Sequence, residues 1–330
     1  MQKSPRYQLS RPTQHFEDVL PNAGQDDEVQ VNEPTRCGFV AILGAPNAGK
    51  ATLLNRLVGT KVSIVSPKVQ TTRRRVLGIT VKDDTQLIFV DTPGIFTPRQ
   101  SKRLEQAIVK AAWSAAYDAD SILLLVDAKR GIDPDTRAII KGLKERNVRA
   151  TLALNKLDLV KPPTLLPLIK ELDGTGLFDR TFVISAETGD GCDDLLAYLL
   201  ESLPEGPWHF PEDQLSDLSN RAMAAEITRE KLFIDLHQEL PYSLTVETES
   251  WVESEDGHEV RIDQVVYVER ATQKGIVLGK GGRQIKAVGQ ASRLELEEIL
   301  GMRVHLFLFV KVRDKWTDDP ERYREMGLEV

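Results

Sequence analysis

The stretch "GFVAILGAPNAGKATLLNRLVG", residues 38–59, decides the fold of the first half of the chain. An apolar run is followed by a glycine-rich loop and then by apolar residues at helical spacing, which predicts a strand, a loop and a helix. The loop nearly fits the pattern G-x-x-x-x-G-K-[ST], since Gly44, Gly49 and Lys50 are in place but Ala51 stands where a hydroxyl is expected. Backbone N–H groups of such a loop can cradle phosphate, so the stretch predicts a phosphate site.

Outward from this stretch, apolar runs alternate with helical patterns. Predicted strands cover 38–44, 85–94, 121–128, 149–158 and 180–189, and predicted helices include 50–59 and 103–119. Such alternation is typical of a mainly parallel sheet with helices on both faces. The fold class predicted for this half is therefore α/β.

The alternation stops near Pro204. The segment "LPEGPWHFPEDQ" holds three prolines and is interpreted as a linker, and the order that follows is helix, strand, strand, helix, helix, strand. This order predicts a smaller α+β domain. The predicted divisions are a disordered tail, a nucleotide domain, a linker, the second domain and a C-terminal tail, at 1–33, 34–204, 205–218, 219–318 and 319–330.

Composition excludes several classes of protein. Of the 330 residues 41% are hydrophobic, but no apolar run approaches the ~20 residues that a membrane span needs. With two cysteines, Cys37 and Cys192, the chain has neither a disulfide framework nor a cysteine metal cluster. The N-terminus lacks an apolar signal-peptide core. We expect a soluble cytoplasmic protein, and at a net charge of −7 any nucleic-acid site must be local.

Three further motifs follow predicted strands. Asp91 in "DTPG" can hold magnesium at the carboxyl edge of the sheet, where α/β folds bind ligands. In "NKLD", Asp158 can accept hydrogen bonds from N1–H and the 2-amino group of guanine, Asn155 can tie the base loop to the phosphate loop, and Lys156 can stack along the base. The backbone of "SAE", residues 185–187, can contact guanine O6.

Each of these motifs alone has an ordinary reading as a turn or a helix cap. Four motifs in chain order, each at the end of a predicted strand, argue against coincidence. The predicted nucleotide-binding residues are Gly44, Ala45, Pro46, Asn47, Ala48, Gly49, Lys50, Ala51, Thr52, Asp91, Thr92, Pro93, Gly94, Asn155, Lys156, Asp158, Ser185, Ala186 and Glu187.

A G-x-x-G loop lies in "IVLGKGGRQIKAVG", residues 276–289. KH domains use such a loop between two helices to clamp about four single-stranded nucleotides. The window from Arg270 to Arg293 holds six basic residues and no acidic one, in a domain that is otherwise acidic. The alternative is a flexible turn with a solvated face, and the element order of a type II KH domain argues against it. The predicted RNA-binding residues are Lys274, Gly279, Lys280, Gly281, Gly282, Arg283 and Lys286.

From about Gly38 to about Asp319 the chain resembles the Era family of P-loop GTPases, on "GAPNAGK", "QTTRRR", "DTPG", "NKLD", "SAE" and "ELPYSLTVE". The resemblance implies an Era-type GTPase domain followed by a type II KH domain, with GTP or GDP and Mg²⁺ as ligands. It implies Lys50, Thr72 and Gly94 in GTP hydrolysis, and Thr72 and Asp91 at the metal, with Thr71 as the alternative to Thr72.

The resemblance also implies partners. These are 16S ribosomal RNA near its 3′ end and the 30S subunit during assembly. It further implies a monomer, with peripheral association at the inner face of the cell membrane as an addition to the cytoplasmic location.

Two positions leave alternatives open. Ile95 follows Gly94 where Ras-like enzymes carry a water-orienting glutamine, so hydrolysis must be arranged otherwise. Asn47 occupies the position that holds K⁺ in several relatives of the family, and its other role is bracing the loop.

Ala51 leaves two hypotheses. Magnesium takes few protein ligands, and a methyl group offers none; Thr52 is rotated about 100° around the helix and does not simply replace it. One hypothesis is a GTP-hydrolysing switch that controls RNA engagement. The other is an RNA-binding assembly factor whose nucleotide domain binds GTP but hardly hydrolyses it.

Overall fold

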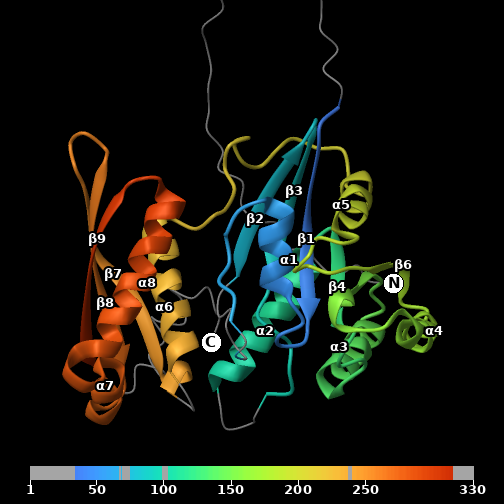
Figure 1. Ribbon diagram of the computed structural model, residues 1–330. Coiled ribbons are helices and arrows are strands. Elements are labelled where there is room, and N and C mark those ends of the chain that lie inside the picture. The colour runs from blue at the N-terminus through green and yellow to red at the C-terminus, as the bar shows by residue number, and fades with distance from the viewer. Residues whose placement is uncertain (1–33, 67, 69–74, 99–102, 237–239, 315–330) are drawn as a thin grey trace, which may run out of the picture. The chain divides into compact units, whose positions relative to one another are not determined.

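The computed structural model describes residues 34–66, 68, 75–98, 103–236 and 240–314 (Figure 1). The predicted N-terminal tail, the C-terminal tail and the segment with Thr71 and Thr72 lie outside the described residues.

The first sheet has six strands in the order β2-β3-β1-β4-β5-β6. The strands are β1 (Arg36–Gly44), β2 (Val76–Lys82), β3 (Thr85–Asp91), β4 (Ser121–Asp127), β5 (Ala150–Asn155) and β6 (Phe178–Val183). β2 pairs antiparallel with β3, and the other neighbours pair parallel. The predicted mainly parallel α/β sheet is confirmed.

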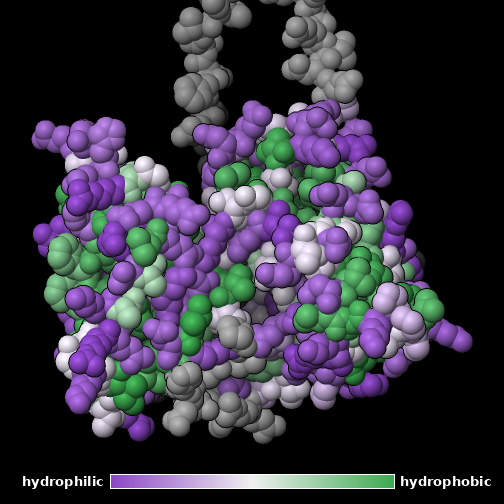
Figure 2. Space-filling view, in the orientation of Figure 1, coloured by the Kyte–Doolittle hydropathy of each residue, from purple (hydrophilic) through white to green (hydrophobic). Residues whose placement is uncertain are grey.

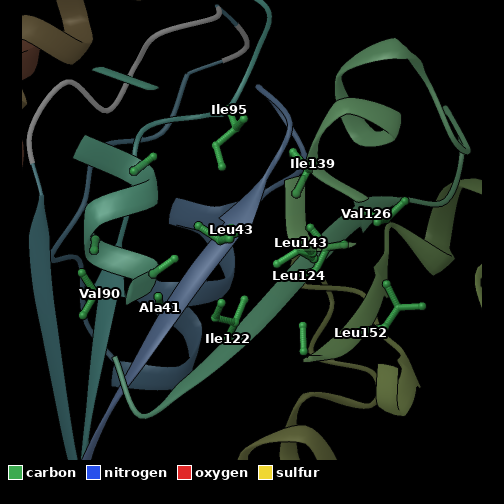
Figure 3. Packing of buried hydrophobic residues seen from close by; sticks show 14 of the residues in the cluster. Ala41, Leu43, Val90, Ile95, Ile122, Leu124, Val126, Ile139, Leu143 and Leu152 are labelled. Carbon is green, nitrogen blue, oxygen red and sulfur yellow. The ribbon is translucent and has the colours of Figure 1, made fainter. Parts of the chain in front are cut away.

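Helices cover both faces of this sheet. They are α1 (Lys50–Val58), α2 (Arg103–Asp118), α3 (Pro134–Glu145), α4 (Leu165–Asp173) and α5 (Cys192–Glu201). Successive residues of a strand point to opposite faces. Ala41 and Leu43 therefore pack in the core under α2 and α3, whereas Val40 and Ile42 pack in the core under α1 and α5. Figure 3 shows the first of these cores.

The second domain has three strands in the order β7-β8-β9. Its elements are α6 (Asn220–Asp235), β7 (Leu244–Glu253), β8 (Glu259–Val268), α7 (Ala271–Leu278), α8 (Arg283–Leu300) and β9 (Arg303–Val312). β7 pairs antiparallel and β9 parallel with β8. This is the α-β-β-α-α-β order that the sequence predicts.

Strand ends and one strand differ from the predictions. β3, β5 and β6 end at Asp91, Asn155 and Val183, so most of each motif lies in a loop and not in the strand. Lys156 has a φ of 71°, a left-handed conformation that stops a strand. The antiparallel edge strand β2 was not predicted.

The segment between the domains is bound to the first sheet. The Ile79 N–H donates to the Leu215 carbonyl at 2.9 Å, and the Leu77 N–H donates to the Asp217 carboxylate at 2.8 Å. The Gln86 amide donates to the Phe210 carbonyl at 2.8 Å. The predicted linker is thus a strap along β2 and β3.

The face in Figure 2 is largely hydrophilic, with hydrophobic residues in scattered groups. Among the described residues, no helix combines the length and the apolar character that crossing a membrane requires.

Candidate functional site

The predicted motif loops meet at one edge of the six-stranded sheet. β1 lies between β3 and β4, so the chain leaves β1 at the point where the strand order reverses. In open α/β sheets the ligand crevice lies at this point, beyond the carboxyl ends of the strands. The loops after β1, β3, β5 and β6 carry the four predicted motifs.

Three glycines of the phosphate region are required by their surroundings. Gly49 has a φ of +100°, and a Cβ there would lie 2.3 Å from the Asn155 amide nitrogen. A Cβ on Gly44 would lie 2.5 Å from the Leu125 carbonyl oxygen. A Cβ on Gly94 would approach the Pro46 backbone to 2.9 Å. The loops therefore pack too closely for any other residue at these positions.

Side chains from the start of α1, from the loop after β4 and from the end of β5 donate hydrogen bonds to the carbonyl groups of the phosphate loop. The bonds are Lys50 Nζ to Gly44 O and Ala45 O (3.1 Å each), Arg130 Nη1 to Pro46 O (3.0 Å), Lys156 Nζ to Asn47 O (2.8 Å) and Asn155 Nδ2 to Ala48 O (2.8 Å). Within the loop the Ala48 N–H donates to the Ala45 carbonyl at 3.2 Å, and backbone N–H groups of a loop of this kind can bind an anion. The loop is thus braced before nucleotide binds.

Lys50 is buried, with 7% of its surface exposed, at the first position of α1. Burial lowers the pKa of its ammonium group to about 8, although the charge of Asp91 acts in the opposite direction. A phosphate beside this group would restore the charged form. The position fits a lysine that meets the phosphates of a bound nucleotide.

The base-recognition loops are joined by side-chain bonds. Ser185 Oγ donates to Asp158 Oδ1 at 2.6 Å. The Ala186 N–H donates to Asn155 Oδ1 at 2.9 Å, so one asparagine connects this loop with the phosphate loop. Asp158 and Glu187 are exposed and Asn155 is buried. Geometry of this kind can present a carboxylate to the edge of a base.

Asp91 lies fully buried at the end of β3. Its carboxylate supplies the hard oxygen that Mg²⁺ prefers, and Mg²⁺ needs few protein ligands because it keeps water and phosphate oxygens. Among the described residues no group of three or more His, Cys, Asp or Glu side chains could hold a metal on its own. A single buried carboxylate of this kind fits a magnesium ion that takes its other ligands from nucleotide phosphates and water.

The remaining predicted residues lie around this carboxylate. Thr92 is buried, and its hydroxyl donates to the Ile42 carbonyl at 2.8 Å; Pro93 is buried as well. Ala51 and Thr52 are half-buried in the first turn of α1. Thr72 lies outside the described residues.

Ile95 points away from the site. Its side chain is 3% exposed and belongs to the core that Figure 3 shows, while its N–H donates to the Gly44 carbonyl at 3.1 Å. This residue therefore holds the loop after β3 against the phosphate loop. Its side chain does not orient water.

The G-x-x-G loop of the second domain joins α7 and α8. Gly279, Gly281 and Gly282 have φ values of 71°, 62° and 74°, which glycine adopts without strain. A Cβ on Gly281 or Gly282 would meet nothing within 4 Å. Lys280 and Arg283 are exposed, as is Lys286, whereas Lys274 is half-buried. The loop is an open, basic surface.

Family profiles match both halves of the chain. The profile described as "50S ribosome-binding GTPase" matches residues 39–156, and the profile described as "KH domain" matches residues 239–317. The chain is 59% identical to the GTPase Era of Sinorhizobium medicae (strain WSM419) over 305 residues, which cover 92% of this chain and 97% of that protein. The chain belongs to the GTPase Era family. It is a GTPase with a KH domain.

A second relative and two solved Era structures support the same family assignment. The GTPase Era of Agrobacterium fabrum is 61% identical over 296 residues, which cover 90% of this chain and 92% of that protein. A crystal structure of Era in complex with MgGDPNP and nucleotides 1506–1542 of 16S ribosomal RNA has a TM-score of 0.83 at 40% identity, covering 89% of this chain and 99% of that chain. A crystal structure of a point variant of Aquifex aeolicus Era bound to GDP·AlF₄⁻ has the same TM-score, identity and coverages.

Several residues of this Era-family site were missed by the sequence analysis. Arg130 holds the phosphate loop, and Arg56 donates to the Ala186 and Glu187 carbonyls. Asp127 pairs with Lys156 at 2.7 Å. Ser63 donates to Asp91. Only Asp127 carried a usable signal, since it ends a predicted strand as Asp91 does.

Proposed function

We propose that this chain is a GTP-hydrolysing switch that binds 16S ribosomal RNA near its 3′ end during assembly of the 30S subunit. One observation carries the proposal. Four nucleotide motifs converge on one sheet edge, in a chain that also presents an open basic G-x-x-G loop. A relative of the same architecture was crystallised with MgGDPNP and with nucleotides 1506–1542 of 16S ribosomal RNA.

The proposal assigns roles to residues of this chain. Asp158 accepts the paired donors of guanine, and the braced loop over residues 44–49 surrounds the phosphates with N–H groups. Lys50 places its charge on them. A bound magnesium ion would supply positive charge to the phosphates. Asp91 would hold it, with Thr72 as the proposed switch ligand and Thr71 as its alternative, and the Gly94 backbone would contact the γ-phosphate.

Positive charge at the transition state has a second proposed source. Asn47 is exposed, with a φ of 63°. Its amide oxygen could coordinate K⁺ at the position that the family resemblance assigns to that ion, and bracing of the loop is the alternative role. Hydrolysis that requires K⁺ and fails with Na⁺ would support the role.

The RNA site of the proposal comprises the seven residues predicted around the G-x-x-G loop. Glycine allows close approach of the RNA backbone, and Lys280, Arg283 and Lys286 meet phosphates. We propose domain boundaries at 204, 219 and 318 and a monomer in the cytoplasm. The proposed membrane association, at the inner face of the cell membrane, is peripheral.

A GTPase assay tests the proposal and separates the two hypotheses. The chain and its Ala51→Ser variant are assayed with and without Mg²⁺, and GTP affinity is measured for both. A hydrolysing switch gives multiple turnovers in the parent chain. The alternative, an assembly factor impaired in hydrolysis, is favoured by Ala51. It predicts that the parent chain binds GTP tightly but hydrolyses it only at the uncatalysed rate, and that Ala51→Ser restores catalysed turnover.

A further inference from the structure

A buried hydroxyl lies beside the candidate magnesium carboxylate. Ser63 is 3% exposed, and its Oγ donates to Asp91 Oδ2 at 2.9 Å. It comes from the first part of the segment between α1 and β2, ahead of the "QTTRRR" motif and outside every predicted nucleotide motif. Val62 and Ile64, both 2% exposed, flank it and anchor this part of the chain in the protein interior.

The Asn55 amide of α1 fixes the backbone of this serine. Asn55 Oδ1 accepts from the Val62 and Ser63 N–H groups at 2.9 Å each, and Asn55 Nδ2 donates to the Ser63 carbonyl at 2.7 Å. Three bonds from one side chain hold the residue in place. The position of the hydroxyl is therefore fixed by these hydrogen bonds, and α1 connects it to the phosphate loop.

The bond has a consequence for the carboxylate. The terminal torsion of an aspartate side chain is broad, so the plane of a carboxylate is set by its hydrogen bonds. In the common phosphate-loop pattern the residue at position 51 carries a hydroxyl that binds magnesium, but Ala51 has no hydroxyl. Among the described residues Ser63 provides a hydroxyl bond to Asp91 from outside the phosphate loop.

We infer that Ser63 is a positioning residue of the magnesium site, whose hydroxyl fixes the plane of the Asp91 carboxylate in a chain that lacks a hydroxyl at position 51. The inference rests on the proposed magnesium–nucleotide site. Outer groups that orient a metal ligand contribute about 10- to 100-fold to metal affinity. Ser63 acts through Asp91 and touches neither nucleotide nor metal in this role.

The test uses the full chain and its Ser63→Ala variant. A fluorescent GDP analogue is bound in EDTA, and Mg²⁺ is titrated while the release rate of the analogue is recorded. We expect the Mg²⁺ concentration at half effect to rise about 10-fold in the variant. The affinity for GDP in EDTA should stay within about twofold, because the braced loop and Lys50 are unchanged.

Two variants separate positioning from folding. Ser121→Ala removes another buried hydroxyl, one with no hydrogen-bond partner among the described residues, and should leave the Mg²⁺ titration unchanged. Ser63→Thr keeps a hydroxyl and should restore most of the Mg²⁺ affinity. Melting temperatures of the nucleotide-free proteins show whether a variant has lost its fold.

The outcomes are distinct. A parent chain that does not bind GDP, or binds it without any Mg²⁺ effect, overturns the proposed nucleotide site and this inference together. A parent that responds to Mg²⁺ and a folded Ser63→Ala variant that responds at the same concentration overturn the inference alone.

Discussion

The phosphate loop and the G-x-x-G loop both depend on glycine, but for different reasons. In the phosphate loop the neighbours exclude a side chain: a Cβ on Gly49 or Gly44 would lie within 2.5 Å of another atom. In the G-x-x-G loop Gly281 and Gly282 face open space, and only their backbone conformation calls for glycine. The phosphate loop is packed against its neighbours at these two glycines, whereas the G-x-x-G loop is open at Gly281 and Gly282.

The two loops also differ in how their charges are held. Lys50 and Lys156 are bonded to loop carbonyls, and Lys156 also to Asp127. Lys280 and Arg283 are exposed at the end of a helix pair. A braced site favours one ligand of fixed shape, while an open basic loop favours an extended polyanion of variable shape. The comparison predicts sharp specificity at the first loop and salt-dependent affinity at the second.

The largest expected effect is at the base. Asp158→Asn removes a charged acceptor for two guanine donors, while its oxygen can still accept from Ser185. GTP affinity should fall about 1,000-fold, or about 4 kcal/mol for two charge-assisted bonds. Xanthosine triphosphate should bind better to the variant than to the parent. Competition assays with GTP, ATP and XTP measure this, and equal competition by GTP and ATP in the parent would show that the base assignment is wrong.

Two glycine substitutions compare the loops directly. Gly49→Ala places a Cβ 2.3 Å from Asn155 Nδ2 at a φ of +100°, so GDP affinity should fall about 100-fold. Gly282→Ala meets only the conformational cost of about 1 kcal/mol, so RNA affinity should fall about fivefold. Calorimetry and RNA-binding assays check both values. Equal losses would mean that the two loops are constrained alike.

Charge reversal tests the open loop. Lys280→Asp with Gly281→Asp should lower the affinity for single-stranded RNA about 30-fold. The slope of log affinity against log salt should become shallower by about 0.7 for each phosphate that the variant no longer neutralises. The control is Arg303→Asp with Gly257→Asp in the same domain. It makes the same change in charge, at an exposed arginine and at a glycine with open space around it. If both pairs weaken RNA binding equally, the effect comes from net charge and the site lies elsewhere.

The smallest expected effect is a pH dependence of the packed loop. Burial lowers the pKa of Lys50 to about 8, and phosphate beside it raises the pKa again, so binding takes up a proton. The free protein loses this proton as the pH rises from about 7.5 to about 8.5, and the complex keeps it. GDP affinity should therefore fall roughly threefold over this range.

Calorimetry in two buffers of different ionisation enthalpy measures the proton uptake near the pKa of Lys50. Lys50→Arg keeps its charge at these pH values and should remove the uptake, even though it also changes the affinity. Uptake that persists in this variant would assign the proton to another group.

The motif residues were predictable because their chemistry demands particular residue types at fixed spacing. Asp91 stands at the end of β3, and Gly49, Lys50 and Asp158 stand in the chain that follows β1 and β5, as the pattern predicts. Whether each binds nucleotide remains a prediction. The family assignment and the order of elements followed from the same patterns.

The bracing side chains could not be predicted from the sequence. Arg56 and Arg130 donate to backbone carbonyls, which every residue carries, so their partners have no signature in the sequence. Ser63 reaches Asp91 only because the chain folds back after α1. β2 was missed because its sequence follows a basic loop and because its position at the sheet edge depends on β3.

The strap along β2 also covers an edge strand that could otherwise pair with another copy of the chain. β2 is an edge strand, and an unpaired edge is a template on which another chain can add a strand and begin to aggregate. The Leu77 and Ile79 N–H groups are occupied by Asp217 and by the Leu215 carbonyl. A fragment cut after residue 204 would expose these donors, and one cut after residue 217 would retain their partners. The segment that joins the two domains therefore covers backbone donors at the edge of the first sheet that could otherwise pair with a strand of another chain.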